Sequence, residues 1–342
     1  MTQVATLFLQ STNFIDAAYI LAFSMLIYGM TGLTGPRTAV RGNQIAAAGM
    51  AIAVVATLLR KGEFHGSSTV WLIILGVAIG TAVGVPAARR VHMTAMPQMV
   101  ALFNGVGGGA VALIAWIEFR HHFGGGWPLR SEVFELFGAI VGSISFWGSN
   151  IAFGKLQGVL SGNPIKLRGQ AVINLVLALV TVASAVILSA GTHSQALFIL
   201  GILVAAGVLG NMVVLPIGGA DMPVVISLLN AFTGVSAAVT GVALNNTALI
   251  VAGMLVGASG SILTNLMAVA MNRSIPAIIA GGFGGGGAVA GAEGAGEHAG
   301  TVRSTTAADA AIQLAYSNRV VIVPGYGMAV AQAQHAVREL TK

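Results

Sequence analysis

The 342-residue sequence contains no cysteine, and only 8% of its residues are charged and 6% aromatic. The absence of cysteine excludes disulfides, thiolate metal sites and cysteine nucleophiles, and no other metal site is predicted. A charged fraction this small, beside a hydrophobic fraction of 56%, excludes an ordinary soluble domain. The sixteen Lys and Arg residues outnumber ten Asp and Glu, but they are scattered through the chain rather than gathered in a stripe, so nucleic acid is not an expected partner. The abundance of apolar residues and of glycine, 47 in all, predicts a polytopic α-helical protein in contact with membrane lipid.

Nine apolar stretches are long enough to cross a bilayer, whose hydrocarbon core needs about 20 helical residues. Breakers such as Gly35-Pro36 and Trp127-Pro128 separate them. The predicted spans are residues 13–34, 43–59, 69–88, 97–119, 133–154, 170–190, 195–217, 222–244 and 247–270.

The basic residues of the short loops predict the orientation, because cytoplasmic loops carry the excess of Lys and Arg. The loops after the first, third, fifth and ninth spans hold eight Lys and Arg residues, and the loops on the opposite side hold four. We therefore expect the N-terminus outside and the C-terminal segment, after residue 272, in the cytoplasm.

Polar residues occur inside spans that are otherwise apolar. In the eighth span, Asp221 stands at the cytoplasmic end and Asn230 lies nine residues further in. Nine residues at ~100° each place the two on roughly opposite helix faces, so we do not expect them to touch. Asp221 is therefore predicted to lie at the mouth of the bundle.

Several spans carry polar side chains at one depth. Asn104, Ser149 and Asn230 all lie ~8–14 Å below the cytoplasmic surface at a rise of ~1.5 Å per residue. The same depth holds three further residues on the seventh and ninth spans: Asn211, Thr264 and Asn265. Two interpretations stay open, a hydrated polar path or hydrogen bonds that only hold the helices together.

Glycine is concentrated directly after Asn104, at positions 105, 107, 108 and 109. Small residues let membrane helices approach closely, which is the favoured interpretation. A flexible point beside a polar gate is the alternative.

The composition changes after the ninth span. Residues 1–272 are predicted to form the membrane domain, and residues 273–304, rich in Gly and Ala, to form a linker. Thr306 and Asp309 have the spacing of a capping box, which predicts a helix over residues 307–316. Residues 319–324 (RVVIVP) are predicted to form a strand, because they are β-branched.

A glycine-rich turn and a helical run follow that strand. A strand, a Gly-x-Gly turn and a helix together bind a dinucleotide pyrophosphate, although Val330 stands where the third Gly or Ala is usual. We interpret residues 305–342 as the truncated start of a Rossmann-like cytoplasmic domain, its first βα unit, because a second strand is missing. An ordinary tight turn stays open as the alternative.

Four segments resemble the beta subunit of the proton-translocating NAD(P) transhydrogenase. They are residues 143–158 (SISFWGSNIAFGKLQG), 218–230 (GGADMPVVISLLN), 271–284 (MNRSIPAIIAGGFG) and 324–334 (PGYGMAVAQAQ). The resemblance implies a multi-pass protein of the inner (plasma) membrane that binds NADP(H). It also implies an alpha subunit that binds NAD(H), dimers of alpha–beta units, and hydride transfer coupled to inward proton movement.

The resemblance also implies roles for individual residues. Asp221 would couple the nucleotide domain to the membrane domain, and Asn104, Ser149 and Asn230 would line the proton path. The pyrophosphate turn would comprise Pro324, Gly325, Tyr326, Gly327, Met328, Ala329, Val330, Ala331 and Gln332. In some members of the family, an asparagine at the position of Asn104 accompanies a histidine on a membrane helix of the alpha component.

Two other classes of protein were weighed. A secondary transporter with a regulatory nucleotide-binding domain would suit polar residues near the midplane. Against it, the sequence has no internal repeat and no charged residue deep in a predicted span. A purely structural membrane anchor, like a transporter, does not require a dinucleotide-binding turn.

Overall fold

The computed structural model describes residues 11–60, 67–122, 128–192, 194–272, 274–282, 305–323, 325, 328 and 333–341. Contacts divide the chain into two units, one of residues 1–91 and 95–285, and one of residues 286–342 with residues 92–94. Each unit is described by itself.

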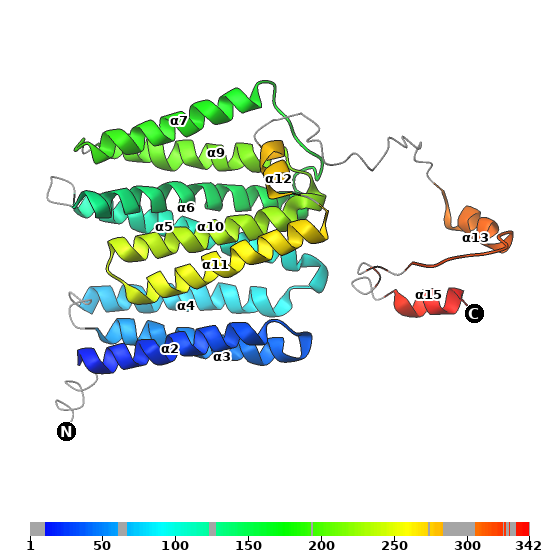
Figure 1. Ribbon diagram of the computed structural model, residues 1–342, viewed down its shortest axis with the longest axis horizontal. Helices are drawn as coiled ribbons and strands as arrows, with labels where there is room; N and C mark the ends of the chain where they lie inside the picture. Colours follow the sequence, from blue (N-terminus) through cyan, green and yellow to red (C-terminus); the bar gives the residue numbers. More distant parts are fainter. Residues whose placement is uncertain are drawn as a thin grey trace. The chain divides into compact units, whose positions relative to one another are not determined.

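All nine predicted spans are confirmed as helices long and apolar enough to cross a membrane within the described ranges. They run side by side in the first unit (Figure 1). The helices are α2 (Thr12–Gly32), α3 (Pro36–Leu59), α4 (Ser67–Arg90), α5 (Met96–His121), α6 (Leu129–Leu156), α7 (Gln170–Ser189), α9 (Ala205–Val214), α10 (Met222–Ala243) and α11 (Thr247–Ala270). The seventh span also includes α8 (Gln195–Leu197) and the π-helical segment η2 (Phe198–Val204) before α9.

Several helices extend beyond their predicted ends. The second was expected to begin at residue 43 but begins at Pro36, because proline is favoured in the first turn, where its missing N–H is not needed. The fifth was expected over residues 133–154 but runs from Leu129 to Leu156. This longer α6 includes Glu132 and Lys155, which the predicted span left out.

Glycine contacts hold the helices of the first unit together. A Cβ on Gly108 of α5 would lie 2.9 Å from the carbonyl oxygen of Gly142 on α6. On α10 and α11, a Cβ on Gly234 would lie 2.5 Å from the amide nitrogen of Gly257. Helix α5 continues through residues 105–109 without a break. Close packing is confirmed at Gly108 and Gly109, whereas a Cβ on Gly105 or Gly107 would make only ordinary contacts.

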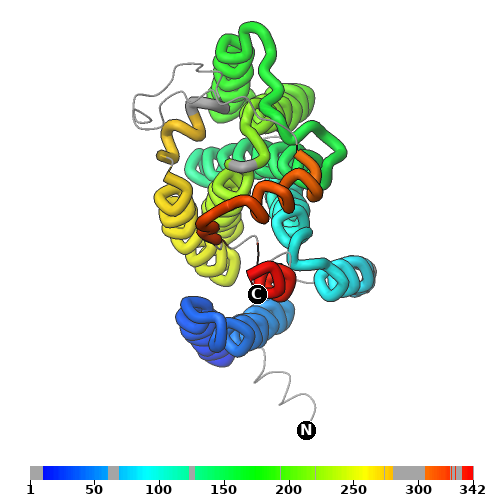
Figure 2. Tube along the Cα trace, turned by 90° about the vertical axis from the view of Figure 1, so that its right-hand side faces the viewer, coloured from blue at the N-terminus to red at the C-terminus, as the bar shows by residue number. Residues whose placement is uncertain are grey.

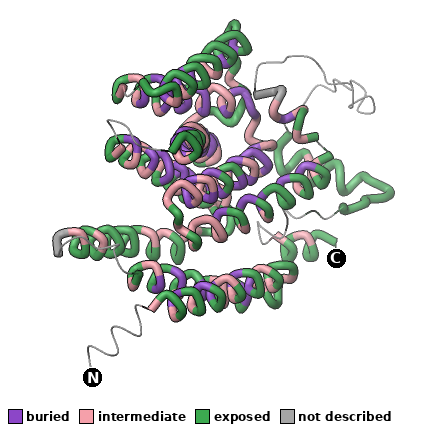
Figure 3. Tube along the Cα trace, turned by 60° about the vertical axis from the view of Figure 1, so that its left-hand side comes forward, coloured by how far each residue is buried: buried purple, intermediate pink, exposed green. Residues whose placement is uncertain are grey.

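Burial is concentrated where α5, α6, α9 and α10 meet (Figure 3). The view along the helices also shows α2 and α3 as a separate pair (Figure 2). In α4, no residue of the apolar window is buried, so its surface is available to lipid or to another membrane chain. Polar side chains buried within the α5–α6–α10 group are therefore the candidates for a site.

The predicted linker is partly helical, since residues 275–282 form α12 (Ile275–Gly282). This helix corrects the expectation of an irregular linker from residue 273. Residues 283–304 lie outside the described residues.

In the second unit, the predicted capping box is confirmed. The Thr306 hydroxyl accepts from the Asp309 amide, and the Asp309 carboxylate accepts from the Thr306 amide at the start of α13 (Ala307–Ala315). The predicted strand is not confirmed, because residues 319–323 take part in no ladder among the described residues, and Val323 is 85% exposed. A strand requires a neighbour for its hydrogen bonds, and none is present here. The last described helix is α15 (Gln334–Leu340), which lies within the predicted helical run.

Candidate functional site

A cluster of hydrogen-bonded polar side chains lies between α5 and α6. The Asn104 amide donates to the Ser149 hydroxyl at 2.9 Å and to the Ser145 hydroxyl at 3.3 Å. Asn104 is 7% exposed, and both serine residues are fully buried. The prediction that Asn104 and Ser149 share one layer is therefore confirmed as direct contact.

The cluster extends to α10 through hydroxyl groups. Ser145 pairs with the Thr233 hydroxyl, and it also donates to the backbone carbonyl of Leu229 at 3.2 Å. Either hydroxyl of the Ser145–Thr233 pair can be the donor. Chains of hydroxyl groups can reverse their donor and acceptor roles, and a proton relay requires this property.

One acceptor of the cluster is unused. Among the described residues, the Asn104 side-chain oxygen is buried without a hydrogen-bond partner. Leaving a buried acceptor unpaired costs roughly 1–3 kcal/mol, so the group calls for water or for a donor from another chain.

The other predicted members of the layer lie elsewhere. Asn230 is half-buried on α10, one turn before Thr233, and makes no hydrogen bond within the described part of the chain. The Thr264 hydroxyl donates to Ser227 at 2.9 Å, which links α10 to α11. Asn265 faces outward and is exposed. The single shared layer is therefore two separate clusters.

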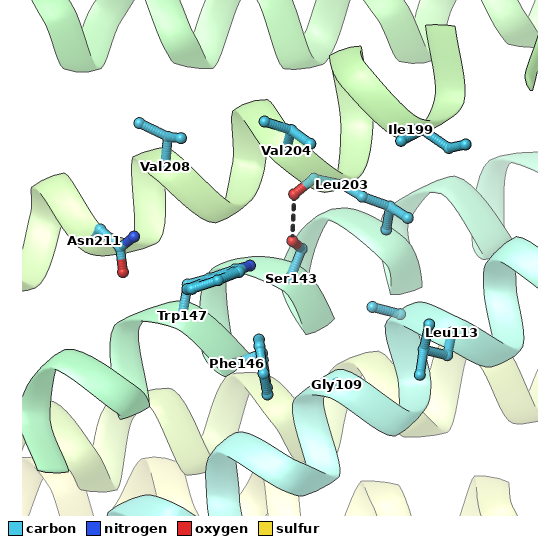
Figure 4. Close-up of a pocket in the computed structure, with 11 residues that line it drawn as sticks. Gly109, Leu113, Ser143, Phe146, Trp147, Ile199, Leu203, Val204, Val208 and Asn211 are labelled. Carbon is cyan, nitrogen blue, oxygen red and sulfur yellow. Dashed lines mark hydrogen bonds between the residues drawn. The ribbon is translucent and has the colours of Figure 1, made fainter. Parts of the chain in front are cut away.

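Asn211 lines a separate cavity between α5, α6 and the seventh span. The cavity has a volume of about 580 Å³. Trp147, Phe146 and Ser143 of α6 face it, and Ser143 donates to the Leu203 carbonyl at 2.6 Å (Figure 4). Most of the lining is apolar, so this space suits an acyl chain or an apolar side chain.

At the predicted cytoplasmic end, Asp221 lies in a 3₁₀ turn, Gly219–Asp221, directly before α10. It occupies the N-cap position, but its side chain does not cap the helix. Its half-buried position at the end of α10 agrees with the prediction of a mouth residue.

Lys155 was predicted to lie in a cytoplasmic loop, but it is 4% exposed and belongs to α6. Its ammonium group donates to the carbonyls of Leu215, Ile217 (2.8 Å) and Asn163 (3.4 Å). Two of these carbonyls belong to the connection between α9 and Asp221. Lys155 therefore fixes that connection to the end of α6.

The predicted nucleotide-binding turn lies largely outside the described residues. Of its nine residues, the structure describes Gly325 and Met328, and the Met328 amide donates to the Gly325 carbonyl at 3.1 Å. Nothing lies within 4 Å of the position that a Cβ would take on Gly325. The role of this turn in binding a pyrophosphate stays a prediction.

Sequence reasoning missed several buried residues of the membrane unit. Ser145 stands four residues before Ser149, and this helical spacing could have placed it on the same face. No comparable spacing in the sequence identifies Thr233. Glu132 and Glu135, which are 7% and 1% exposed, are buried in the first two turns of α6, and neither was predicted as a site residue. Glu132 lay just outside the predicted span of residues 133–154, and Glu135 lay near its start.

Comparison with known proteins gives one consistent result. The family model of the NAD(P) transhydrogenase beta subunit matches residues 15–342. Two proteins named NAD(P) transhydrogenase subunit beta, from Rhodospirillum rubrum and from one of its strains, are each 45% identical over 330 residues. Each match covers 95% of this chain and 70% of the relative. The chain therefore belongs to the NAD(P) transhydrogenase beta subunit family, whose members work in the transhydrogenase reaction together with an alpha subunit.

Proposed function

We propose that residues 1–272 form the proton-conducting domain of the transhydrogenase and residues 305–342 begin its NADP(H)-binding domain, joined by residues 273–304. NAD(H) binds to the alpha subunit. When bound, NADP(H) gives or takes the hydride, and the turn from Pro324 to Gln332 holds its pyrophosphate. Two alpha–beta units associate, with the N-terminus of this chain outside and residues 273–342 in the cytoplasm.

The observation that carries the proposal is the hydrogen-bonded cluster in the membrane unit, in which Asn104 donates to both Ser149 and Ser145, and Ser145 pairs with Thr233. This cluster joins three helices and keeps one buried acceptor, the Asn104 oxygen, free within the described residues. We assign Asn230, one turn from Thr233, to the same path.

None of these four side chains titrates near neutral pH, so they can relay a proton but cannot store a charge. The free Asn104 oxygen accepts from a donor on the alpha subunit. A histidine in a membrane helix of that subunit suits this role, because the unperturbed pKa of histidine is ~6.5.

The test is Asn104→Leu in the full-length beta subunit assembled with its alpha partner. Reduction of an NAD analogue by NADPH is measured in membrane vesicles, with and without an uncoupler, together with dye-monitored proton uptake. The variant should assemble normally and lose coupled activity, whereas Asn104→His should keep part of it. Normal pumping by Asn104→Leu would remove Asn104 from the path.

A secondary transporter with a nucleotide-binding regulatory domain remains the alternative. No observation on the chain favours it. It predicts that a solute crosses the membrane in the absence of nucleotide turnover, which the same vesicles can measure.

A further inference from the structure

A second group of polar side chains lies at the opposite end of the same helices. Its centre is Glu135 of α6, which is 1% exposed. Neither carboxyl oxygen has a hydrogen-bond partner in the part of the chain that the structure describes. A carboxyl group that served only to hold helices together would be paired, because an unpaired buried polar group costs free energy.

Two more unpartnered polar atoms lie at this level on the neighbouring helices. The Thr240 hydroxyl of α10 is fully buried, and the indole nitrogen of Trp116 on α5 is buried as well. Among the described residues, neither has a hydrogen-bond partner. An acid, a hydroxyl and an N–H donor on three adjoining helices are the groups that bind buried water, which needs two to four polar partners.

Glu135 lies on the same face of α6 as the hydroxyl cluster. The positions 135, 138, 142, 145 and 149 follow a three–four spacing and fall within about 80° of the helix circumference. On α10, Thr233 and Thr240 are separated by two turns and also share a face. Helices α6 and α10 therefore contact each other at two levels. Ser145 contacts Thr233 at the first, and at the second a Cβ on Gly138 would overlap the Thr240 hydroxyl.

Between the two groups, positions 138 and 142 of α6 are glycine, and the neighbouring helices pack directly against them: the Thr240 hydroxyl of α10 at Gly138, and the backbone of α5 at Gly142. From Ser149 to Glu135 the helix rises ~21 Å, which is most of the ~30 Å hydrocarbon core. The polar face therefore reaches from the inner half of the bundle to its outer end.

Few charged groups surround Glu135. Helices α7, α9 and α10 and the segment η2 carry none in their sequences, and Glu118 of α5 is near enough to repel a Glu135 carboxylate. Arg120 of α5 lies 5.4 Å from the ring centre of Trp116, and His122 lies 3.8 Å from Glu118. The charged or titratable residues on the elements packed here are Glu118, Arg120, His121, His122, Arg130 and Glu132.

We propose that Glu135 is a proton-loading group of the path, with Thr240 and Trp116 holding a water beside it. The inference rests on the proposed proton path and orientation. A proton from the outer aqueous phase binds the Glu135 carboxylate and forms its O–H bond. That bond breaks when the proton passes to water between α6 and α10 and on to Thr233 and Ser145, while the carboxylate recovers the electron pair.

The test compares Glu135→Gln with Glu135→Asp in the full-length complex reconstituted in liposomes. Glutamine keeps the size and loses the proton, whereas aspartate keeps the proton and is one methylene shorter. A positioned proton-transfer group contributes ~10²–10⁴-fold, so Glu135→Gln should lower proton pumping on the order of 100-fold and Glu135→Asp much less. A structural role reverses this order, because glutamine preserves the packing better.

A second readout follows the proton itself. Infrared difference spectra between the NADP⁺- and NADPH-bound complexes should contain a protonated-carboxyl band that disappears in Glu135→Gln. Thr240→Val should lower pumping, while Thr181→Val, a buried threonine of α7 whose hydroxyl donates to Leu177, should not. Wild-type pumping by Glu135→Gln, or a band unchanged by it, overturns the proposal.

The failure of the two proposals can be told apart. Normal pumping by Asn104→Leu alone would remove the inner path. Loss of pumping in Asn104→Leu but not in Glu135→Gln would leave that path intact and overturn only the role of Glu135.

Discussion

The substitution Gly142→Ala tests whether the contact between α5 and α6 maintains the hydroxyl cluster. A Cβ on Gly142 would lie 2.6 Å from the Gly108 carbonyl oxygen and 3.0 Å from the Ala112 amide nitrogen. Ordinary van der Waals contact of a Cβ begins near 3.4 Å, so the helices must separate by about 0.8 Å at this point. Both nearest atoms belong to the backbone and cannot rotate away.

The consequence for the cluster follows from its distances. The Asn104–Ser149 hydrogen bond is 2.9 Å long, and Ser149 lies two turns from Gly142 on the same helix. Transmission of the full separation would lengthen it to roughly 3.7 Å, which is too long for an N–H···O hydrogen bond, usually about 2.7–3.2 Å. Overpacking typically lowers the free energy of unfolding by ~1–3 kcal/mol. Replacing a glycine within a helix by alanine raises it by roughly 0.5–1 kcal/mol.

We therefore expect Gly142→Ala to assemble with slightly reduced thermal stability and to lose most proton pumping. The control is Gly76→Ala on α4, where nothing lies within 4 Å of the added Cβ, and it should be as stable as the wild type or more stable. The assays are thermal unfolding of the purified complex and dye-monitored pumping in liposomes. A Gly142→Ala complex with wild-type melting and wild-type pumping would refute the reasoning.

Three other variants test the ends of the path. Lys155→Met keeps the side-chain stem but leaves the Ile217 carbonyl without the donor that it has in the structure, while the Leu215 carbonyl still accepts from the Ile165 amide. An unpaired buried carbonyl costs ~1–3 kcal/mol, so the melting temperature of the complex should fall; an unchanged melting curve would mean that water replaces the ammonium group. Asp221→Asn keeps the shape and removes the charge, and pumping should fall much more than expression does; an unchanged coupling ratio and rate would count against a coupling role. Gly327→Val places a side chain where the pyrophosphate should approach, so NADP(H) affinity measured by calorimetry on the full-length protein should be lost while membrane insertion is normal; wild-type affinity would remove the turn from the site.

The long apolar runs predicted the nine helices because hydrocarbon allows a single chain few ways to satisfy its backbone groups. The similar depth of Asn104 and Ser149 was also predicted from the sequence, but their hydrogen bond was not, because depth does not show which helices adjoin. The prediction from depth was wrong for Asn265, which is exposed, because depth does not determine which side of a helix faces the bundle.

Errors at helix ends had larger effects. Placing the start of the fifth span at residue 133 left Glu132 outside the helix, and placing its end at residue 154 made Lys155 a loop residue. Long helices can begin and end beyond the apolar run, because buried polar residues near each end are stabilised by partners that the sequence does not show. For residues 319–323, the β-branched pattern indicates a local preference for extended backbone. A strand also needs a neighbouring strand to pair with.

Helix α6 connects the two ends of the path mechanically. Lys155 fixes the end of α6 to the connection that leads into Asp221 and α10. Ser149 lies six residues before Lys155, a rise of ~9 Å along a continuous helix. Thr233 lies twelve residues after Asp221 on α10, and it pairs with Ser145. A displacement of the Asp221 turn must therefore move α6 and α10 together or slide one against the other, and only sliding separates Ser145 from Thr233. The hydrogen bonds of Lys155 hold this connection to the end of α6, so we expect them to favour the joint movement.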